Sequence, residues 1–154
     1  MHSMRRHEKE ITDPVQIASI LDRARVLCLA LHDEPAPYVI PVSFGVEGGT
    51  LYVHSAPRGA KIDLLASHPR LGFTAWADET LVTGESACDW GVRASSVAGI
   101  GTARVVTDPP EKLRGLDAIM RHYGAAGPVY RPDVLARTTV IAIAIDSMRA
   151  KRVG

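Results

Sequence analysis

The chain has 154 residues, of which 46% are hydrophobic, and this length and composition suit one domain with a substantial apolar core. Its 18 Lys and Arg residues nearly balance its 17 Asp and Glu residues, and the charges are scattered along the sequence. Such a pattern argues against a basic face for nucleic acid or for lipid headgroups. We therefore predict that the partner is a small molecule, with no nucleic acid and no membrane involved.

The cysteines and the amino terminus bear on the cellular compartment. Cys28 and Cys88 are far apart, with no CxxC motif and no histidine at metal-ligand spacing, which disfavours a disulfide framework and a zinc site. The first ten residues, MHSMRRHEKE, are charged, and no apolar run approaches about 18 residues, so neither secretion nor a membrane span is predicted. We expect a cytoplasmic protein with reduced thiols. Cys28, in the apolar segment VLCLAL, is interpreted as a core residue, and Cys88 as the more exposed thiol.

Three helices are predicted in chain order. The first begins after Asp13, a capping residue, with Pro14 at the first helical position, and continues to about residue 24. The second covers about 59–67, and the third runs from the proline pair 109–110 to a glycine at position 124. Residues 124–137, rich in Gly, Pro and Arg, are predicted to form a long loop or a mobile lid.

Strands outnumber these helices. The hydrophobic pattern predicts strands near 25–31, 37–46, 50–55, 70–77, 79–84, 95–106 and 138–145. Gly48 and Gly49, in the segment VEGGTL, can adopt positive φ and predict a hairpin between the second and third strands. Because strands and helices do not alternate regularly, a doubly wound parallel sheet is disfavoured. A closed or nearly closed antiparallel barrel with peripheral helices fits the pattern better.

The segment LYVHSAPRGAKIDLL, residues 51–65, predicts a strand, a break and a helix. Ser55, Arg58 and Lys61 lie around the break, close to the free N–H groups and the positive dipole end of the helix. This combination suits a phosphate group. A GxxxxGK loop for nucleoside triphosphates does not fit, because the first glycine and the hydroxyl residue after the lysine are missing. From spacing alone, Arg58 and Lys61 could equally be solvated charges at a helix start.

Five segments resemble, in this order, successive blocks of one protein family. They are similar to the nitroimidazole-resistance proteins of the pyridoxamine 5′-phosphate oxidase-like flavin split barrels, and they read MRRHEKEITDPVQIASIL, ARVLCLAL, PYVIPVSFGVEGGTLYVHSAPRGAKIDLL, CDWGVRASSVAGIGTARVV and EKLRGLDAIM. The resemblance spans nearly the whole chain and is most specific over residues 37–65. It implies a six-stranded antiparallel split β-barrel, mainly β with peripheral helices, and a homodimer with FMN bound in two clefts at the subunit interface.

The resemblance also implies the residues that contact the cofactor. Three consecutive residues would line the isoalloxazine, with their strand backbone meeting its polar edge: Val42, Ser43 and Phe44. Four others would serve the ribityl phosphate end, and one more would approach from a later block: His54, Ser55, Arg58, Lys61 and Ser96. An interface histidine is an equal alternative for His54. Ala94 and Ser95 stand where family members often have an aromatic and then a basic or polar residue, which allows a changed or larger cofactor pocket.

These observations predict an FMN-dependent oxidoreductase that acts on small planar electron acceptors, nitroaromatics among them. We assign no catalytic side chain and no metal site, because the flavin of such enzymes carries the hydride or electrons itself. Two alternatives stay open: a non-enzymatic binder of haem or another tetrapyrrole, and a deazaflavin-dependent reductase on the same barrel. Trp76 is interpreted as a packing residue, with stacking on a flat ring as the alternative.

Overall fold

Eight strands form one antiparallel sheet within residues 6–154, the part of the chain that the computed structural model describes; the first five residues of the charged amino-terminal segment lie outside it. The order is β3-β2-β6-β7-β8-β5-β4, and β1 pairs with β8. The strands are β1 (Glu10–Ile11), β2 (Leu27–Leu31), β3 (Tyr38–Val42), β4 (Phe44–Glu47), β5 (Thr50–Ser55), β6 (Arg70–Val82), β7 (Gly91–Val105) and β8 (Thr139–Val153).

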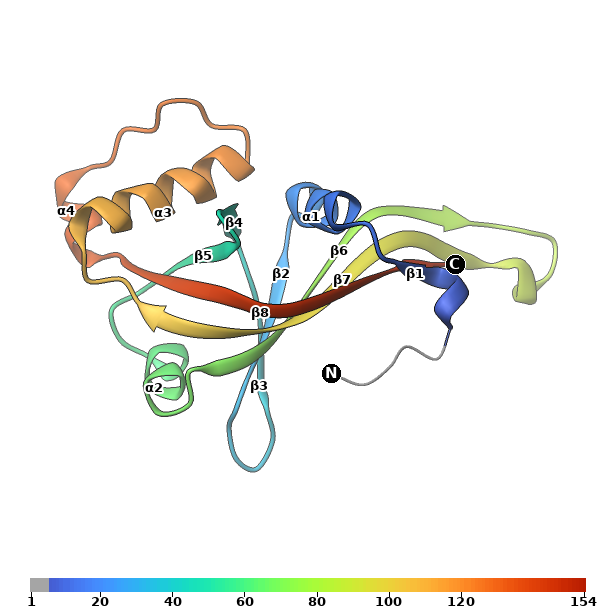
Figure 1. Ribbon diagram of the computed structural model, residues 1–154, viewed down its shortest axis with the longest axis horizontal. Coiled ribbons are helices and arrows are strands. Elements are labelled where there is room, and N and C mark those ends of the chain that lie inside the picture. The colour runs from blue at the N-terminus through green and yellow to red at the C-terminus, as the bar shows by residue number, and fades with distance from the viewer. Residues whose placement is uncertain (1–5) are drawn as a thin grey trace.

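The sheet curls into a split barrel, whose two end strands, β3 and β4, are consecutive in the chain but do not pair with each other. β3 and β4 are separated only by Ser43, yet β3 pairs with β2 and β4 pairs with β5. Figure 1 shows the long strands β7 and β8 crossing the molecule, with the helices placed around the barrel. The predicted antiparallel barrel with peripheral helices is therefore confirmed, with eight strands in the described residues instead of six.

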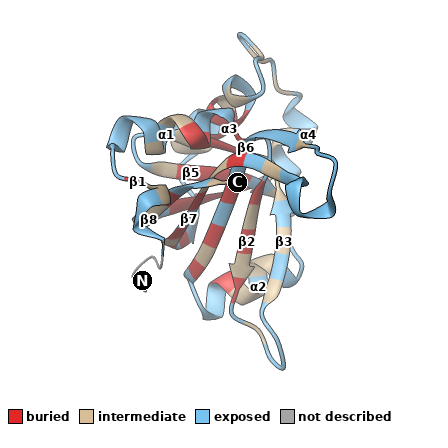
Figure 2. Ribbon diagram, turned by 90° about the vertical axis from the view of Figure 1, so that its right-hand side faces the viewer, coloured by how far each residue is buried: buried red, intermediate tan, exposed pale blue. Residues whose placement is uncertain are grey.

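Period-two alternation fills the barrel interior. On β2 the residues Leu27, Leu29 and Leu31 are fully buried, whereas the residues between them are partly exposed. The inner face of β8 contributes Ile141 and Ile143, whereas Val140 and Ala142 are buried on its other face, and Figure 2 shows the buried stripes along the strands. Each such side chain contributes about 1.5–3 kcal/mol when it leaves water, so this face fixes the register of the sheet.

Local capping signals place the helices. In α1 (Pro14–Arg23) the Asp13 carboxylate accepts a hydrogen bond from the Val15 N–H at 3.0 Å, and in α3 (Pro109–His122) the Asp108 carboxylate accepts one from the Glu111 N–H at 2.9 Å. With α2 (Ala60–Ser67), these helices confirm the three that the sequence predicts. None of the helices in residues 6–154 is both long and apolar enough to cross a membrane.

A second apolar cluster lies outside the barrel, where α3 covers β5 and β8. It contains Tyr52, Val106, Leu116, Ala118, Ile119, Val140 and Ala142. Gly45 of β4 lets α3 come close, because a Cβ at that position would lie 2.3 Å from the carbonyl carbon of Ala118. The helix backbone therefore rests directly on β4.

Several boundaries differ from those predicted. The predicted strand 37–46 is two strands, since the chain changes pairing partner at Ser43. The predicted strands 70–77 and 79–84 are one strand, β6, which carries a bulge at Asp78 and Glu79. The predicted loop 124–137 contains a further helix, α4 (Pro132–Arg137).

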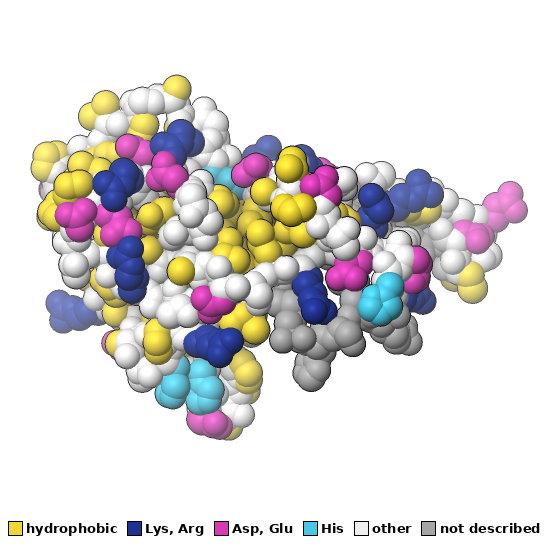
Figure 3. All heavy atoms as spheres, in the orientation of Figure 1, with side chains coloured by type: hydrophobic (Ala, Val, Ile, Leu, Met, Phe, Trp, Pro, Cys, Tyr) yellow, Lys and Arg dark blue, Asp and Glu magenta, His cyan; other side chains and the backbone are white. Residues whose placement is uncertain are grey.

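The two longest strands also extend beyond the predicted ranges, since β7 begins at Gly91 and β8 continues to Val153. Their extra residues include several exposed charged side chains, among them Arg93, Lys151 and Arg152, so their hydrophobic pattern is weak. On the face shown in Figure 3, basic and acidic side chains are interspersed around a central hydrophobic area. This face carries no block of a single charge, in agreement with the scattered charges of the sequence.

Candidate functional site

Ser43 forms a corner at which four of the predicted ligand residues meet. Val42 makes the last pair of the β2–β3 ladder, with Leu27, and Phe44 makes the first pair of the β4–β5 ladder, with Val53. Ser43 lies between the two ladders, and the residue after Val53 is His54. The structure therefore brings the segment 42–44 and the end of β5 together on adjacent strands.

The side chains at this corner differ in exposure. Ser43 and His54 are exposed, and Val42 is partly buried against the barrel core. The Phe44 side chain is fully buried, with its ring 4.3 Å from the ring of His122. A ligand contact from Phe44 can therefore come only from its backbone, and its N–H already donates to the Tyr123 hydroxyl at 3.3 Å.

The start of α2 provides an unneutralised positive group. Gly59 precedes the helix at a φ of 126°, and no side chain caps the first turn. Within the described residues, neither Arg58 nor Lys61 makes an ion pair: Arg58 is exposed, whereas Lys61 is partly buried. Burial lowers the pKa of the Lys61 ammonium, because desolvation disfavours the charged form. An anion at this point would compensate that cost.

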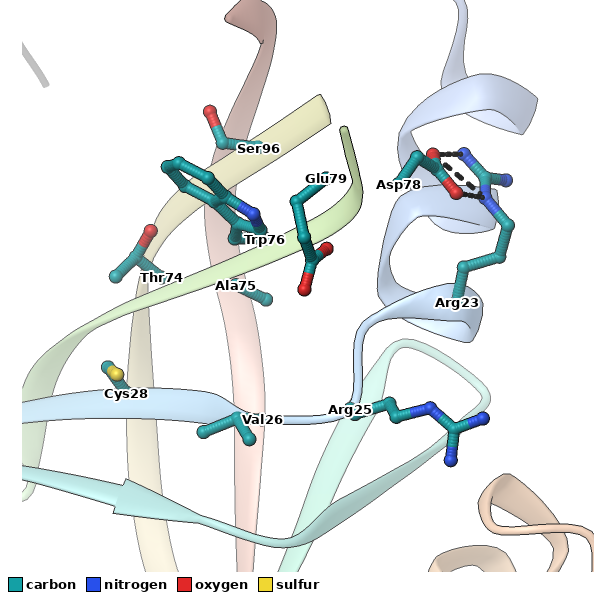
Figure 4. Close-up of a pocket in the computed structure, with 10 residues that line it drawn as sticks. All are labelled: Arg23, Arg25, Val26, Cys28, Thr74, Ala75, Trp76, Asp78, Glu79 and Ser96. Atoms are coloured by element: carbon teal, nitrogen blue, oxygen red, sulfur yellow. Dashed lines mark hydrogen bonds and ion pairs between the residues drawn. The ribbon is translucent and has the colours of Figure 1, made fainter. Parts of the chain in front are cut away.

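A cavity of about 540 Å³ opens on the outer face of β2 and β6, close to the carboxyl end of α1 (Figure 4). Its volume lies within the range of about 300–1,000 Å³ that is common for ligand pockets. Outward-facing residues of three neighbouring strands form it, since Cys28 pairs with Thr74 and Trp76 pairs with Ser96. The lining residues are Arg23, Arg25, Val26, Cys28, Thr74, Ala75, Trp76, Asp78, Glu79 and Ser96.

An ion pair closes one wall of this cavity. Arg23, the last residue of α1, donates from Nε and Nη2 to both carboxylate oxygens of Asp78, at 2.8–3.1 Å. The hydrogen bond from Arg23 lowers the pKa of the Asp78 carboxyl, and the same bond raises the pKa of Arg23. The pair is exposed, so it contributes little to stability. It neutralises both charges and ties α1 to the bulge in β6.

A second cavity, of about 520 Å³, shares Arg23, Arg25 and Asp78 with the first and reaches the carboxyl end of α3. There the Tyr123 hydroxyl donates to the Arg25 carbonyl at 2.7 Å, and His122 Nε2 lies 2.6 Å from the Ala24 carbonyl oxygen. These contacts join α3 to the start of β2. Because Tyr123 also bonds Phe44, the second cavity reaches the Ser43 corner.

The chain matches the family model for pyridoxamine 5′-phosphate oxidase over residues 13–152. It belongs to this family. The resemblance noted in the sequence is thereby confirmed at the family level. No curated relative matches the chain.

Solved structures of the same fold extend this finding. A protein from Bacteroides thetaiotaomicron VPI-5482 that is assigned to 5-nitroimidazole antibiotic resistance has 31% identity and a TM-score of 0.82, over 99% of this chain and 97% of that one. The FAD and heme binding protein from Mycobacterium smegmatis has 25% identity and a TM-score of 0.79, over 93% and 72% of the two chains. The flavocytochrome Anf3 from Azotobacter vinelandii shares the fold, with 23% identity and a TM-score of 0.79 over 97% and 72%.

Two residues that line the first cavity of this pyridoxamine 5′-phosphate oxidase family member differ from the predictions made from the sequence. Trp76 is 45% exposed and lines the cavity, so the packing role that the sequence predicts for it is wrong. Cys28 is partly exposed and also lines the cavity instead of filling the core. The alternation of the strand could have indicated the position of Trp76. Ala75 and Ala77, which flank it, face inward, so Trp76 faces outward. Cys88 is exposed, as predicted.

The block around Ser96 also differs from expectation. Ser96 lines the cavity, whereas Ala94 is buried and Ser95 pairs with the buried Ala77. Neither Ala94 nor Ser95 is among the cavity residues. The departure from the family pattern at these two positions therefore does not enlarge this cavity directly.

Proposed function

We propose that the protein is an FMN-dependent oxidoreductase that reduces small planar electron acceptors, nitroimidazoles and other nitroaromatics among them. One observation carries the proposal. Lys61 is partly buried and has no counter-ion in the described residues, and it lies in the first turn of α2, which no side chain caps. In the chain, this helix comes after the Ser43 corner and β5. Family membership and the 31% identity to a protein assigned to 5-nitroimidazole resistance support the chemistry.

The residues present suit the phosphate end of FMN. Lys61 and Arg58 offer cationic donors, Ser55 offers a hydroxyl, and the first turn of α2 offers N–H groups at the positive end of its dipole. A phosphate here would neutralise Lys61, whose charged form is disfavoured by burial. The exposed His54 precedes this group on β5.

The corner suits the ring end. Ser43 lies outside both ladders, so its backbone groups face no strand partner there, and its exposed hydroxyl is available to a ligand. The flavin, when bound, supplies the hydride or electron transfer. Lys61 and its neighbours would hold the phosphate, and the 42–44 segment would orient the ring.

We also propose that the cofactor site is completed by a second copy of the chain. Away from the cavity, the outward residues of β2, β6 and β7 are mostly small or apolar, and they include Ala30, Gly72, Ala98 and Ile100. Small side chains let two sheets approach closely, and an exposed face of this kind is typical of a protein interface. A twofold pair would place this face of one copy against the other and give two equivalent clefts.

Sedimentation tests this assembly. At micromolar concentration the FMN-loaded protein is expected to sediment as a dimer, because the site would be completed by the partner. A sedimentation coefficient of a monomer with FMN still bound would contradict the shared site.

Absorbance of the purified protein tests the cofactor. After incubation with FMN and removal of the excess by gel filtration, we expect flavin absorption bands at one FMN per chain. A haem Soret band in the protein as purified would favour the tetrapyrrole alternative. The similarity to the FAD and heme binding protein from Mycobacterium smegmatis supports that alternative. A colourless protein that retains no added FMN would refute the proposal.

A further inference from the structure

A bulge in β6 places an aromatic ring and a carboxylate in the same cavity. Ala77 pairs with Ser95 and Thr80 pairs with Arg93, so two residues of β6 stand opposite one residue of β7. Asp78, the first of these two, has a φ of 61°. In a regular strand, residues three positions apart face opposite sides of the sheet. The extra residue shifts this alternation, so that Trp76 and Glu79 both line the cavity.

Glu79 is the unneutralised charge beside the indole. Its carboxylate is exposed and has no hydrogen bond or ion pair within residues 6–154. Figure 4 shows it between the indole of Trp76 and the Arg23–Asp78 pair, in which both charges are neutralised. A negative charge thus stands next to a half-exposed aromatic face.

The other cations near the cavity do not cancel this charge. In Figure 4 the Arg25 side chain points away from Trp76, and Arg25 also lines the second cavity, which reaches Tyr123. Lys151 and Arg149 pair with Ser96 and Ala98 in the β7–β8 ladder, and neither is among the residues that line the cavity. The surroundings of the indole therefore favour a cation over an anion.

The hydroxyl groups add one free donor. Thr74 Oγ1 already donates to the Val97 carbonyl at 2.8 Å. Ser96 Oγ has no partner within the described residues, and Ser96 pairs with Trp76 across the β6–β7 ladder. A ligand that lies on the indole can therefore also bond Ser96.

We infer that this cavity binds a flat, positively charged aromatic molecule, with its ring on Trp76 and its charge beside Glu79. The indole face attracts a cation through its quadrupole, and the carboxylate adds a direct Coulomb attraction. The inference deepens the proposed function by naming the class of acceptor. The inference rests on the proposed function only for the reduction of the bound molecule by FMN, because binding in the cavity needs no flavin.

Fluorescence titration of the flavin-free protein tests the inference. The chain has two tryptophans, so a Trp90→Phe background leaves Trp76 as the only indole reporter. The probes are N-methylquinolinium, a flat cation, and 2-naphthoate, an anion of similar shape. We expect N-methylquinolinium to bind about tenfold more tightly than 2-naphthoate, and Glu79→Gln to weaken its binding about five- to tenfold. Glu85→Gln, which removes an exposed carboxylate outside the cavity, should change neither affinity.

Two results would overturn the inference: equal or tighter binding of 2-naphthoate, or an unchanged affinity for N-methylquinolinium in Glu79→Gln. Either result would leave the FMN proposal intact, because no flavin is present in the titration. Failure of the protein to retain FMN, together with the expected probe selectivity, would instead reject the proposed function and keep the cavity assignment.

Discussion

Replacing Lys61 with alanine is expected to weaken FMN binding about ten- to hundredfold and to leave riboflavin binding nearly unchanged. Lys61 is partly buried, so its ammonium would make a charge-assisted hydrogen bond to the phosphate in a partly screened site. Such bonds contribute about 1.5–3 kcal/mol, and each factor of ten in affinity corresponds to about 1.4 kcal/mol. Titration with FMN and with riboflavin, followed by flavin fluorescence, measures both dissociation constants. Riboflavin has no phosphate and is therefore the matched ligand control.

Arg58→Ala serves as the matched variant. Arg58 is exposed, so its contribution to phosphate binding is screened, and a smaller loss is expected than for Lys61→Ala. Equal losses of FMN and riboflavin in Lys61→Ala would mean that the substitution damages the whole cleft. No loss of either ligand would show that Lys61 is a solvated helix charge without a phosphate.

The pH dependence of FMN binding follows from the same lysine. Burial lowers the pKa of the free Lys61 ammonium, and a bound phosphate would favour the charged form and raise that pKa again. FMN affinity should therefore be full below the lowered pKa of the free protein and fall as the pH rises through it. In Lys61→Ala this alkaline decline is expected to be absent.

The helices of this protein are predictable from sequence because their signals are local. Asp13 and Asp108 each precede a proline and cap the helix through their carboxylates, so a few adjacent residues determine the helix start. The ends of β7 and β8 lack such a signal. Their outer residues pair with each other and include exposed charged side chains, so only the ladder defines them.

The candidate site divides in the same way. The group at Ser55, Arg58 and Lys61 is contained in one short segment, and its position before a helix is visible in the sequence. The first cavity is not visible in the sequence, because it depends on pairings between residues far apart in the chain, such as that of Cys28 with Thr74. The bulge that brings Glu79 into the cavity is also not visible in the sequence. It is defined by two residues of β6 opposite one residue of β7, and so only the pairing of the two strands reveals it.

The corner that holds these parts together depends on the close approach of α3 to β4, and Gly45→Ala should disrupt it. The new Cβ would lie 2.3 Å from the carbonyl carbon of Ala118 and 2.4 Å from the Ile119 nitrogen, both backbone atoms, so the helix itself must move. We expect a loss of about 3 kcal/mol, at the upper end for overpacking, and a fall in melting temperature of about 6–12 °C. Thermal unfolding followed by circular dichroism measures this change.

Gly91→Ala is the matched control for Gly45→Ala, because both glycines belong to strands, Gly91 at the start of β7, and they differ in the space around them. A Cβ at position 91 would have no other heavy atom within 4 Å. Alanine also restricts the unfolded chain, so this variant should melt close to the wild type or slightly above it.

In Gly45→Ala the displaced α3 would also pull Tyr123 away from the Arg25 carbonyl and the Phe44 N–H, so FMN affinity should fall even where the protein is still folded. Equal melting temperatures for the two variants would show that α3 does not rest on β4 as described.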